Sequence, residues 1–144
     1  MLPDILVVDA SILFSFFKKD SARRGLIEVL PLRGSRLISP KFAFTELLDI
    51  RERIMRYAKI DESEFLFLFS LIERKIDSFP EEKYGRFLME AAEISPHGED
   101  TKDDAYFALA LAFNCPIWSD EEAFKKQDKV KILTTEDVVK LLGF

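Results

Sequence analysis

A chain of 144 residues with 48% hydrophobic side chains is long enough to bury a core and too apolar to be disordered, so we expect one domain over residues 1–144. Its formal charge of −5 argues against loose, charge-driven binding to nucleic acid, and no apolar run approaches the roughly 20 residues that span a bilayer. The single cysteine, Cys115, excludes an internal disulfide framework and indicates a cytoplasmic protein. The single histidine, His97, weighs against a histidine-based zinc site and against a Ser-His-Asp triad.

The first predicted strand is an apolar run that ends at an aspartate. Residues 4–8 include Leu6, Val7 and Val8 without alternation, which is typical of a strand covered on both faces of a parallel sheet. Asp9 follows, and a stretch of helical character runs on to Lys18. Because open parallel sheets bind ligands beyond the carboxyl ends of their strands, Asp9 is interpreted as either a helix N-cap or a metal ligand.

The middle of the chain predicts one short strand among helices. The strand covers residues 36–40, and the helices cover 21–30, 40–57 and 62–76, the last one capped by Asp61. The unusually apolar run Phe65 to Phe69 is interpreted as the core face of its helix, with a dimer interface as the alternative.

The last third returns to alternating strands and helices. We predict strands at residues 77–80, 116–119 and 130–133, and helices at 80–94, 103–113, 120–126 and 135–142. The whole pattern predicts an α/β protein, a three-layer α/β/α fold with four or five parallel strands. The first and fourth strands should lie side by side.

Acidic residues fall where these elements begin or end. The candidates are Asp9, Glu46, Asp103, Asp104, Asp120 and Glu121. Since the chain has 26 acidic residues, and since helix starts favour them, this pattern by itself leaves helix capping and a shared site equally open.

Four segments containing these acids resemble the PIN-domain family of metal-dependent ribonucleases, which includes toxin halves of prokaryotic toxin–antitoxin pairs. The segments are Val7-Val-Asp9-Ala-Ser11, Phe44-Thr-Glu46-Leu, Asp103-Asp-Ala-Tyr106-Phe-Ala108-Leu-Ala110 and Pro116-Ile-Trp-Ser119-Asp120-Glu121. Their order and spacing together carry the resemblance, which spans nearly the whole chain.

The resemblance implies an endoribonuclease whose carboxylates hold Mg²⁺ or Mn²⁺. Asp9, Glu46 and Asp103 would be ligands, completed by Asp120 or Glu121. Alignment of Tyr106 with the family helix selects Asp103 over Asp104 as the third acid. The family's spacing after Asp103 then indicates Glu121 as the fourth acid and places Asp120 at a position that varies within the family. RNA as substrate, an antitoxin partner and a homodimer are implied as well.

Residues near these acids are candidates for supporting roles. Ser11, Ser119 and Asp104 would orient the ligands by hydrogen bonds, although each hydroxyl would equally cap a helix. A basic group on one predicted helix, Arg51, Arg53 and Arg56, would contact RNA phosphates or else form a solvated face.

Two other hypotheses compete with the nuclease. The first is a non-catalytic PIN-like interaction module, in which the acids only cap helices. The second is a phosphoacceptor α/β domain, which is weaker because no acidic pair precedes Asp9. Metal-dependent RNA cleavage distinguishes the nuclease from the interaction module.

Overall fold

The computed structural model describes residues 1–96 and 102–144, so the single histidine, His97, lies outside the described part. Within these residues the centre is an all-parallel sheet of five strands in the order β3-β2-β1-β4-β5. The strands are β1 Ile5–Val8, β2 Arg36–Pro40, β3 Ile76–Phe79, β4 Ile117–Trp118 and β5 Ile132–Leu133. The predicted fold class and the neighbouring first and fourth strands are therefore confirmed, with Val7 opposite Ile117.

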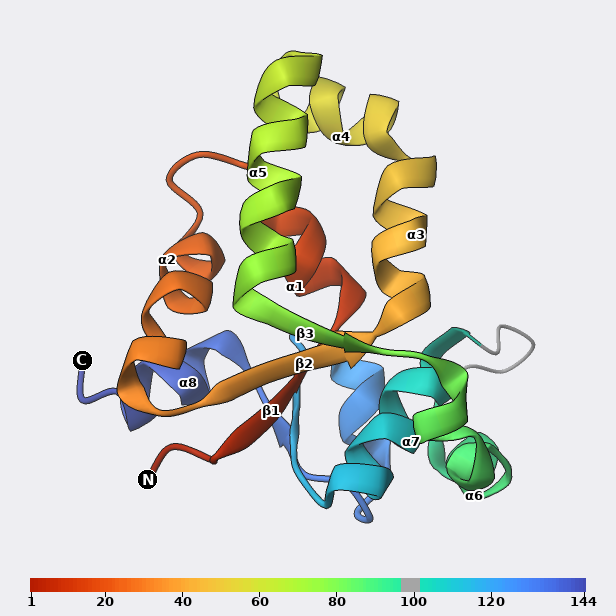
Figure 1. The fold of residues 1–144 in the computed structure, drawn as a ribbon. Helices are drawn as coiled ribbons and strands as arrows, with labels where there is room; N and C mark the ends of the chain where they lie inside the picture. Colours follow the sequence, from red (N-terminus) through yellow and green to blue (C-terminus); the bar gives the residue numbers. More distant parts are fainter. Residues whose placement is uncertain (97–101) are drawn as a thin grey trace.

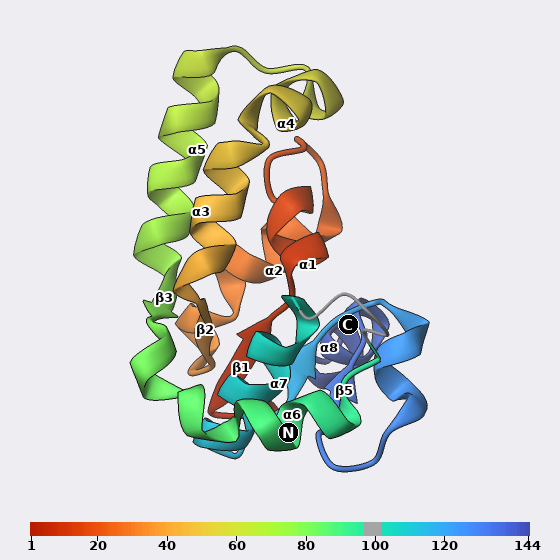
Figure 2. The ribbon, with the colours of Figure 1, turned by 90° about the vertical axis from the view of Figure 1, so that its right-hand side faces the viewer.

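Helices cover both faces of this sheet, which makes the three layers (Figures 1 and 2). Helices α1 to α5 lie on one side, and α6 and α7 lie on the other. The α-helices are α1 Ala10–Ser15, α2 Ala22–Val29, α3 Lys41–Asp49, α4 Arg51–Ala58, α5 Glu62–Lys75, α6 Leu88–Ile94, α7 Lys102–Phe113 and α8 Thr135–Leu141. Short 3-10 turns are η1 Pro31–Arg33, η2 Glu81–Lys83, η3 Gly85–Phe87 and η4 Glu122–Lys126.

The sheet is buried on both faces, as the unbroken apolar run of β1 predicted. Leu6, Val7 and Val8 have no exposed surface, and Trp118 of β4 is equally buried. On the α7 side, the ring of Phe107 packs 5.1 Å from that of Phe124 in η4. Burial of this kind is the dominant favourable term in folding, so these rings and aliphatic chains hold the layers together.

Three predicted helices differ from those observed. The helix expected over residues 40–57 is divided at Ile50, whose φ of −103° and ψ of 18° are not helical. No proline or glycine lies at this break, so the sequence gives no local signal for it. We attribute the break to packing, because the change of direction lets Ile54 become fully buried while the arginines of α4 stay exposed. The helix expected over 80–94 is divided where Tyr84 is buried, and residues 122–126 form only a 3-10 turn.

The helix caps follow local sequence more closely. Asp61 and Glu64 form a capping box at the start of α5, in which each side chain accepts a hydrogen bond from the other residue's backbone N–H. The left-handed Lys59, with φ of 58°, ends α4. No helix in the described ranges is both long and apolar enough to cross a membrane.

The strand order has a switch point at β1, on the two sides of which successive strands are added. The chain passes from β1 to β2 and β3 on one side, then returns to β4 and β5 on the other. In open α/β sheets the crevice beyond the carboxyl ends of the strands at such a point is the preferred ligand site. Asp9 follows β1 there and Ser119 follows β4.

Candidate active site

Asp9 is buried at the end of β1 and is held by three hydrogen bonds. The whole residue is 3% exposed. Oδ1 accepts a bond of 2.7 Å from the backbone N–H of Ala10, which makes Asp9 the N-cap of α1. Oδ2 accepts bonds of 2.9 Å from the hydroxyl of Ser11 and 2.8 Å from that of Ser119. Asp9 therefore caps a helix and also has its second oxygen fixed by two hydroxyls.

The pKa of Asp9 lies above its ordinary value of 3.8. Burial of the carboxylate is the largest cause, because a low-dielectric surrounding disfavours the charged form. The hydrogen bonds from Ser119, Ser11 and Ala10 and the positive charge of Arg23 oppose the shift without cancelling it. A cation beside Asp9 would offset this desolvation.

Glu46 and Asp103 come to the same region from α3 and α7. Both side chains are half-buried. The ammonium of Lys102 lies 3.0 Å from Oε2 of Glu46, so a residue next to Asp103 along α7 bridges the two helices. Glu46 thus has a cationic partner of its own.

The hydroxyl of Tyr106 lies in the field of all three carboxylates. Burial first, and then the negative charges of Asp9, Glu46 and Asp103, raise the pKa of Tyr106 well above its ordinary value. Three acids from three different parts of the chain therefore act on one side chain of α7. Yet among the described residues no three acidic, histidine or cysteine side chains lie close enough to form a ready metal centre. Repulsion between like charges is a physical reason for such an open arrangement.

Asp104 has a different position from its neighbour Asp103. It is 7% exposed, and its Oδ1 accepts a hydrogen bond from the hydroxyl of Ser95, directly after α6. The side chain therefore ties the start of α7 to the end of α6.

Asp120 is engaged by a cation and a hydroxyl from other parts of the chain. Nε and Nη2 of Arg23 lie 3.0 and 2.6 Å from its Oδ2. Thr135 donates its backbone N–H to Oδ1 at 2.7 Å and its hydroxyl to Oδ2 at 2.5 Å. Burial by itself would raise the pKa of Asp120, but the bonds from Thr135 and Arg23 outweigh it, and the pKa lies below 3.8.

Glu121 is exposed and is linked to Asp9 through one intermediate group. Its backbone N–H donates to the hydroxyl of Ser119 at 3.1 Å, and that hydroxyl donates to Asp9. The segment following β4 is thereby attached to the end of β1.

A groove of about 450 Å³ opens beside Glu46, between α1 and the pair α3–α4. Glu46, Arg23 and Arg53 line it together with Phe14 and Tyr57. A second cavity of about 520 Å³, lined by Lys18, Lys19 and Asp120, shares Ser15, Arg23 and Tyr57 with the first and so continues it.

The predicted basic group on α4 is divided by this groove. The guanidinium of Arg53 lies 5.6 Å from the centre of the Phe14 ring, inside the lining. Arg51 and Arg56 are exposed on α4 outside it. Of the three arginines named from the sequence, Arg53 therefore lines this groove, together with Arg23, which the sequence analysis did not name.

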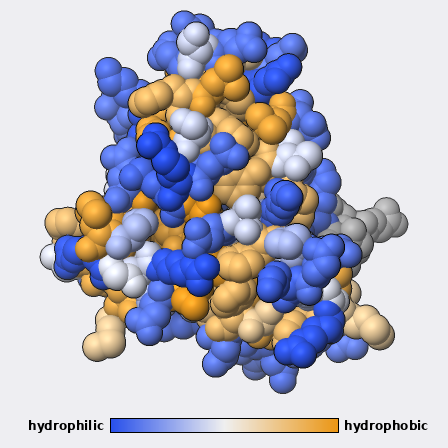
Figure 3. Space-filling view, in the orientation of Figure 1, coloured by the Kyte–Doolittle hydropathy of each residue, from blue (hydrophilic) through white to orange (hydrophobic). Residues whose placement is uncertain are grey.

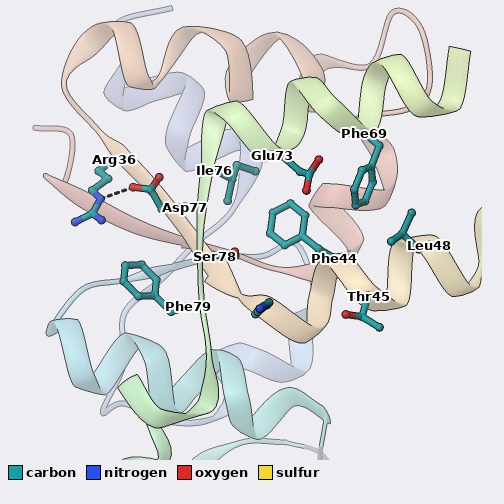
Figure 4. A pocket seen from close by; sticks show the side chains of 11 residues that line it. Arg36, Phe44, Thr45, Leu48, Phe69, Glu73, Ile76, Asp77, Ser78 and Phe79 are labelled. Atoms are coloured by element: carbon teal, nitrogen blue, oxygen red, sulfur yellow. Dashed lines mark hydrogen bonds and ion pairs between the residues drawn. The ribbon is translucent and has the colours of Figure 1, made fainter.

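Another groove, of about 520 Å³, lies at the free edge of β3 (Figure 4). Phe44, Leu48 and Phe69 line it, with the ion pair between Arg36 and Asp77 at 2.6 Å on its border. None of the candidate acids lines it. The groove beside Glu46 is therefore the candidate site.

Sequence reasoning missed four of these groups. Arg23 lies 97 residues from Asp120, and Lys102 lies 56 residues from Glu46, so no local pattern marks either pair. Thr135 lies 15 residues after Asp120, at the start of α8, and no local pattern marks that pair either. Tyr106 offered a signal, because it follows Asp103 by three residues and so shares its helix face.

The donor set suits a hard divalent cation. Asp9, Glu46 and Asp103 offer only oxygen atoms, which Mg²⁺ and Mn²⁺ prefer. The buried hydroxyl of Tyr106, on which all three act electrostatically, is a further oxygen that has no hydrogen-bond partner in the described part of the chain. On these grounds the residues present fit such an ion.

Comparisons with known proteins agree with the motifs. A family model described as PIN domain matches residues 7–142. A solved structure, VapBC2 from Rickettsia felis bound to a DNA fragment from the promoter, has a similar fold with a TM-score of 0.65. The two chains are 12% identical, and the match covers 90% of this chain and 98% of that chain. No curated protein sequence matches.

Proposed function

Because the chain belongs to the PIN-domain family, we propose that it is an endoribonuclease that uses Mg²⁺ or Mn²⁺ to hydrolyse RNA phosphodiester bonds. The observation that carries the proposal is that Asp9, Glu46 and Asp103 all act electrostatically on the buried Tyr106 hydroxyl, together with a nearby groove that two arginines line.

The protein's own groups have separate roles in this proposal. Asp9, Glu46 and Asp103 hold the cation, with Glu121 or Asp120 as the fourth carboxylate. Ser11 and Ser119 fix the orientation of Oδ2 of Asp9 by their hydrogen bonds. When bound, the cation lowers the pKa of a water molecule and neutralises charge on the phosphate oxygens.

The groove residues bind and orient the RNA strand. Arg53 and Arg23 present guanidinium groups to phosphates, while Lys18 and Lys19 extend the cationic lining past Asp120. Local cationic lining reconciles RNA binding with the net charge of −5. Arg51 and Arg56 would act only on RNA that extends beyond the groove.

The test is cleavage of labelled single-stranded RNA with Mn²⁺, with Mg²⁺ and with EDTA. The wild-type protein should cleave only with metal, and Asp9→Asn should abolish cleavage. Asp77→Asn is the matched control, since Asp77 pairs with Arg36 at the distant edge of the sheet. Cleavage that persists in Asp9→Asn would contradict the proposal.

A non-catalytic interaction module is the second candidate, and one observation favours it. Asp9 caps α1, Glu46 pairs with Lys102, and Asp120 pairs with Arg23, so three of the acids already have structural partners. Calorimetric titration with Mn²⁺ separates the two functions. If the wild-type protein binds no Mn²⁺, the interaction module is the better description.

We also propose an antitoxin protein and a second copy of the chain as partners. The resemblance to toxin-like PIN proteins and the fold shared with VapBC2 support the first. Exposed apolar side chains over α5 and α3 support the second (Figure 3). The most exposed are Leu66 and Phe67 on α5, followed by Leu48 on α3. Co-purification with the product of a neighbouring reading frame tests the antitoxin.

A further inference from the structure

The Tyr106 hydroxyl stands out by its lack of a partner. Among the buried side-chain nitrogen and oxygen atoms of residues 1–96 and 102–144, it is the one without a hydrogen bond. The whole residue is 1% exposed, so bulk water does not reach it. Its ring is well packed, with the Phe42 ring edge-on at 5.8 Å.

Such a hydroxyl destabilises the folded state. Burial removes its hydrogen bonds to water, and no group among the described residues replaces them. A phenylalanine would keep the contact with Phe42 and avoid this loss. A buried polar group of this kind calls for a partner that the polypeptide itself does not supply, such as water or an ion.

The surroundings of the hydroxyl specify that partner. Asp9 at the end of β1, Glu46 on α3 and Asp103 one turn earlier on α7 all act on it electrostatically. A group that enters among three carboxylates must be cationic, and one that pairs with the hydroxyl must also offer a hydrogen bond. A divalent cation that keeps some of its water satisfies both requirements.

We propose that Tyr106 is a positioning residue of the acidic site, whose hydroxyl accepts a hydrogen bond from a water molecule carried by the divalent cation between Asp9, Glu46 and Asp103. This inference rests on the metal site of the proposed function. The role is indirect, because the tyrosine holds a water molecule and not the ion. Partners of this outer kind commonly change metal affinity by about 10–100-fold.

The test is Tyr106→Phe, examined by thermal unfolding with and without Mn²⁺ and by calorimetric titration at constant temperature. Without metal the variant should melt about 2–4 °C higher, because an unpaired buried hydroxyl has been removed. With metal its affinity for Mn²⁺ should fall about tenfold, so the metal-induced rise in Tm should shrink. If Tyr106 had only a structural role, its replacement would not raise the Tm without metal and at the same time lower the affinity for Mn²⁺.

Tyr84→Phe is the matched control. Tyr84 is also buried, but the charges that act on it are those of Glu81 and Glu82. Its variant should keep the wild-type affinity for Mn²⁺. If the wild-type protein binds Mn²⁺ and Tyr106→Phe binds it equally well, the role of Tyr106 is overturned while the metal site stands. If the wild-type protein binds none, the metal site itself is overturned, and the role of Tyr106 with it.

Discussion

The hydroxyl of Ser119 donates a hydrogen bond of 2.8 Å to Oδ2 of Asp9, although the two residues are 110 positions apart. The bond joins the end of β4 to the end of β1, where the adjacent strands also share the bond from Asp9 N–H to the carbonyl of Trp118 at 3.1 Å. Through the backbone of Glu121, the same hydroxyl attaches the next acidic segment. The first and fourth family motifs therefore meet at one atom, and variants on either side of it should be coupled.

Asp9→Asn should stabilise the protein without metal and weaken its response to metal. Asparagine keeps an oxygen for the cap on Ala10 and removes a buried charge, so Tm should rise by roughly 2–4 °C for about 1 kcal/mol gained. The rise in Tm with Mn²⁺ should shrink, because a ligand of the native state has been weakened. Thermal melts with and without Mn²⁺ measure both, and an undiminished Mn²⁺ response would count against Asp9 as a ligand.

The advantage of Asp9→Asn should depend on pH. Since the pKa of Asp9 is raised above 3.8 in the folded state, that state binds more protons than the unfolded one between the two values. The wild-type protein therefore loses stability as pH rises through this window. The difference in Tm between variant and wild type should be smallest near pH 3.8 and grow to a plateau above the folded pKa. Melts without metal across this range check the sign, and a difference that shrinks with rising pH would refute it.

Asp103→Asn and Asp104→Asn should differ although the residues are adjacent. Asp103 acts on Tyr106 with Asp9 and Glu46, whereas Asp104 accepts a hydrogen bond from Ser95. We expect Asp103→Asn to weaken Mn²⁺ binding about tenfold or more, and Asp104→Asn to do so less. Calorimetric titration of both variants with Mn²⁺ measures the two affinities. Equal losses, or a larger loss in Asp104→Asn, would show that the alignment through Tyr106 is wrong.

Asp120→Asn and Glu121→Gln should separate structural support from metal binding. Asp120 is held by Arg23 and Thr135, and its lowered pKa means that its charge stabilises the fold above pH 3.8 and ceases to do so as pH falls through the folded pKa. At neutral pH Asp120→Asn should therefore lower Tm by about 2–4 °C and leave Mn²⁺ affinity nearly unchanged. Glu121→Gln should leave Tm unchanged and weaken Mn²⁺ binding. The reverse pattern would identify Asp120 as the fourth ligand.

The wild-type protein should be a dimer that a charge on α5 disrupts. Phe67 is 61% exposed and Leu66 is 50% exposed, and no element of the described chain covers them further. Burying such side chains in a symmetric interface removes apolar surface from water, so Phe67→Glu should shift the population to monomer. Light scattering at tens of micromolar measures the mass, with Met89→Glu on the opposite side of the sheet as control. A monomeric mass for the wild-type protein would contradict the proposed dimer.

Short-range patterns in the sequence determined most of the architecture. Unbroken apolar runs such as Leu6 to Val8 predict buried parallel strands, because only a strand covered on both faces needs no polar alternation. The capping box of Asp61 and Glu64 and the bond from Ser11 to Asp9 are equally local, since each joins residues within three positions. The order of the strands then follows from the few connections that parallel sheets allow.

The tertiary structure alone decided which polar groups meet and which stay unpaired. Arg23 reaches Asp120 and Lys102 reaches Glu46 because the crossovers bring segments that are distant along the chain to the same edge of the sheet. The break at Ile50 and the solitary hydroxyl of Tyr106 likewise depend on how whole layers pack. No periodicity of the sequence predicts these features, because each depends on how segments that are distant along the chain pack against one another.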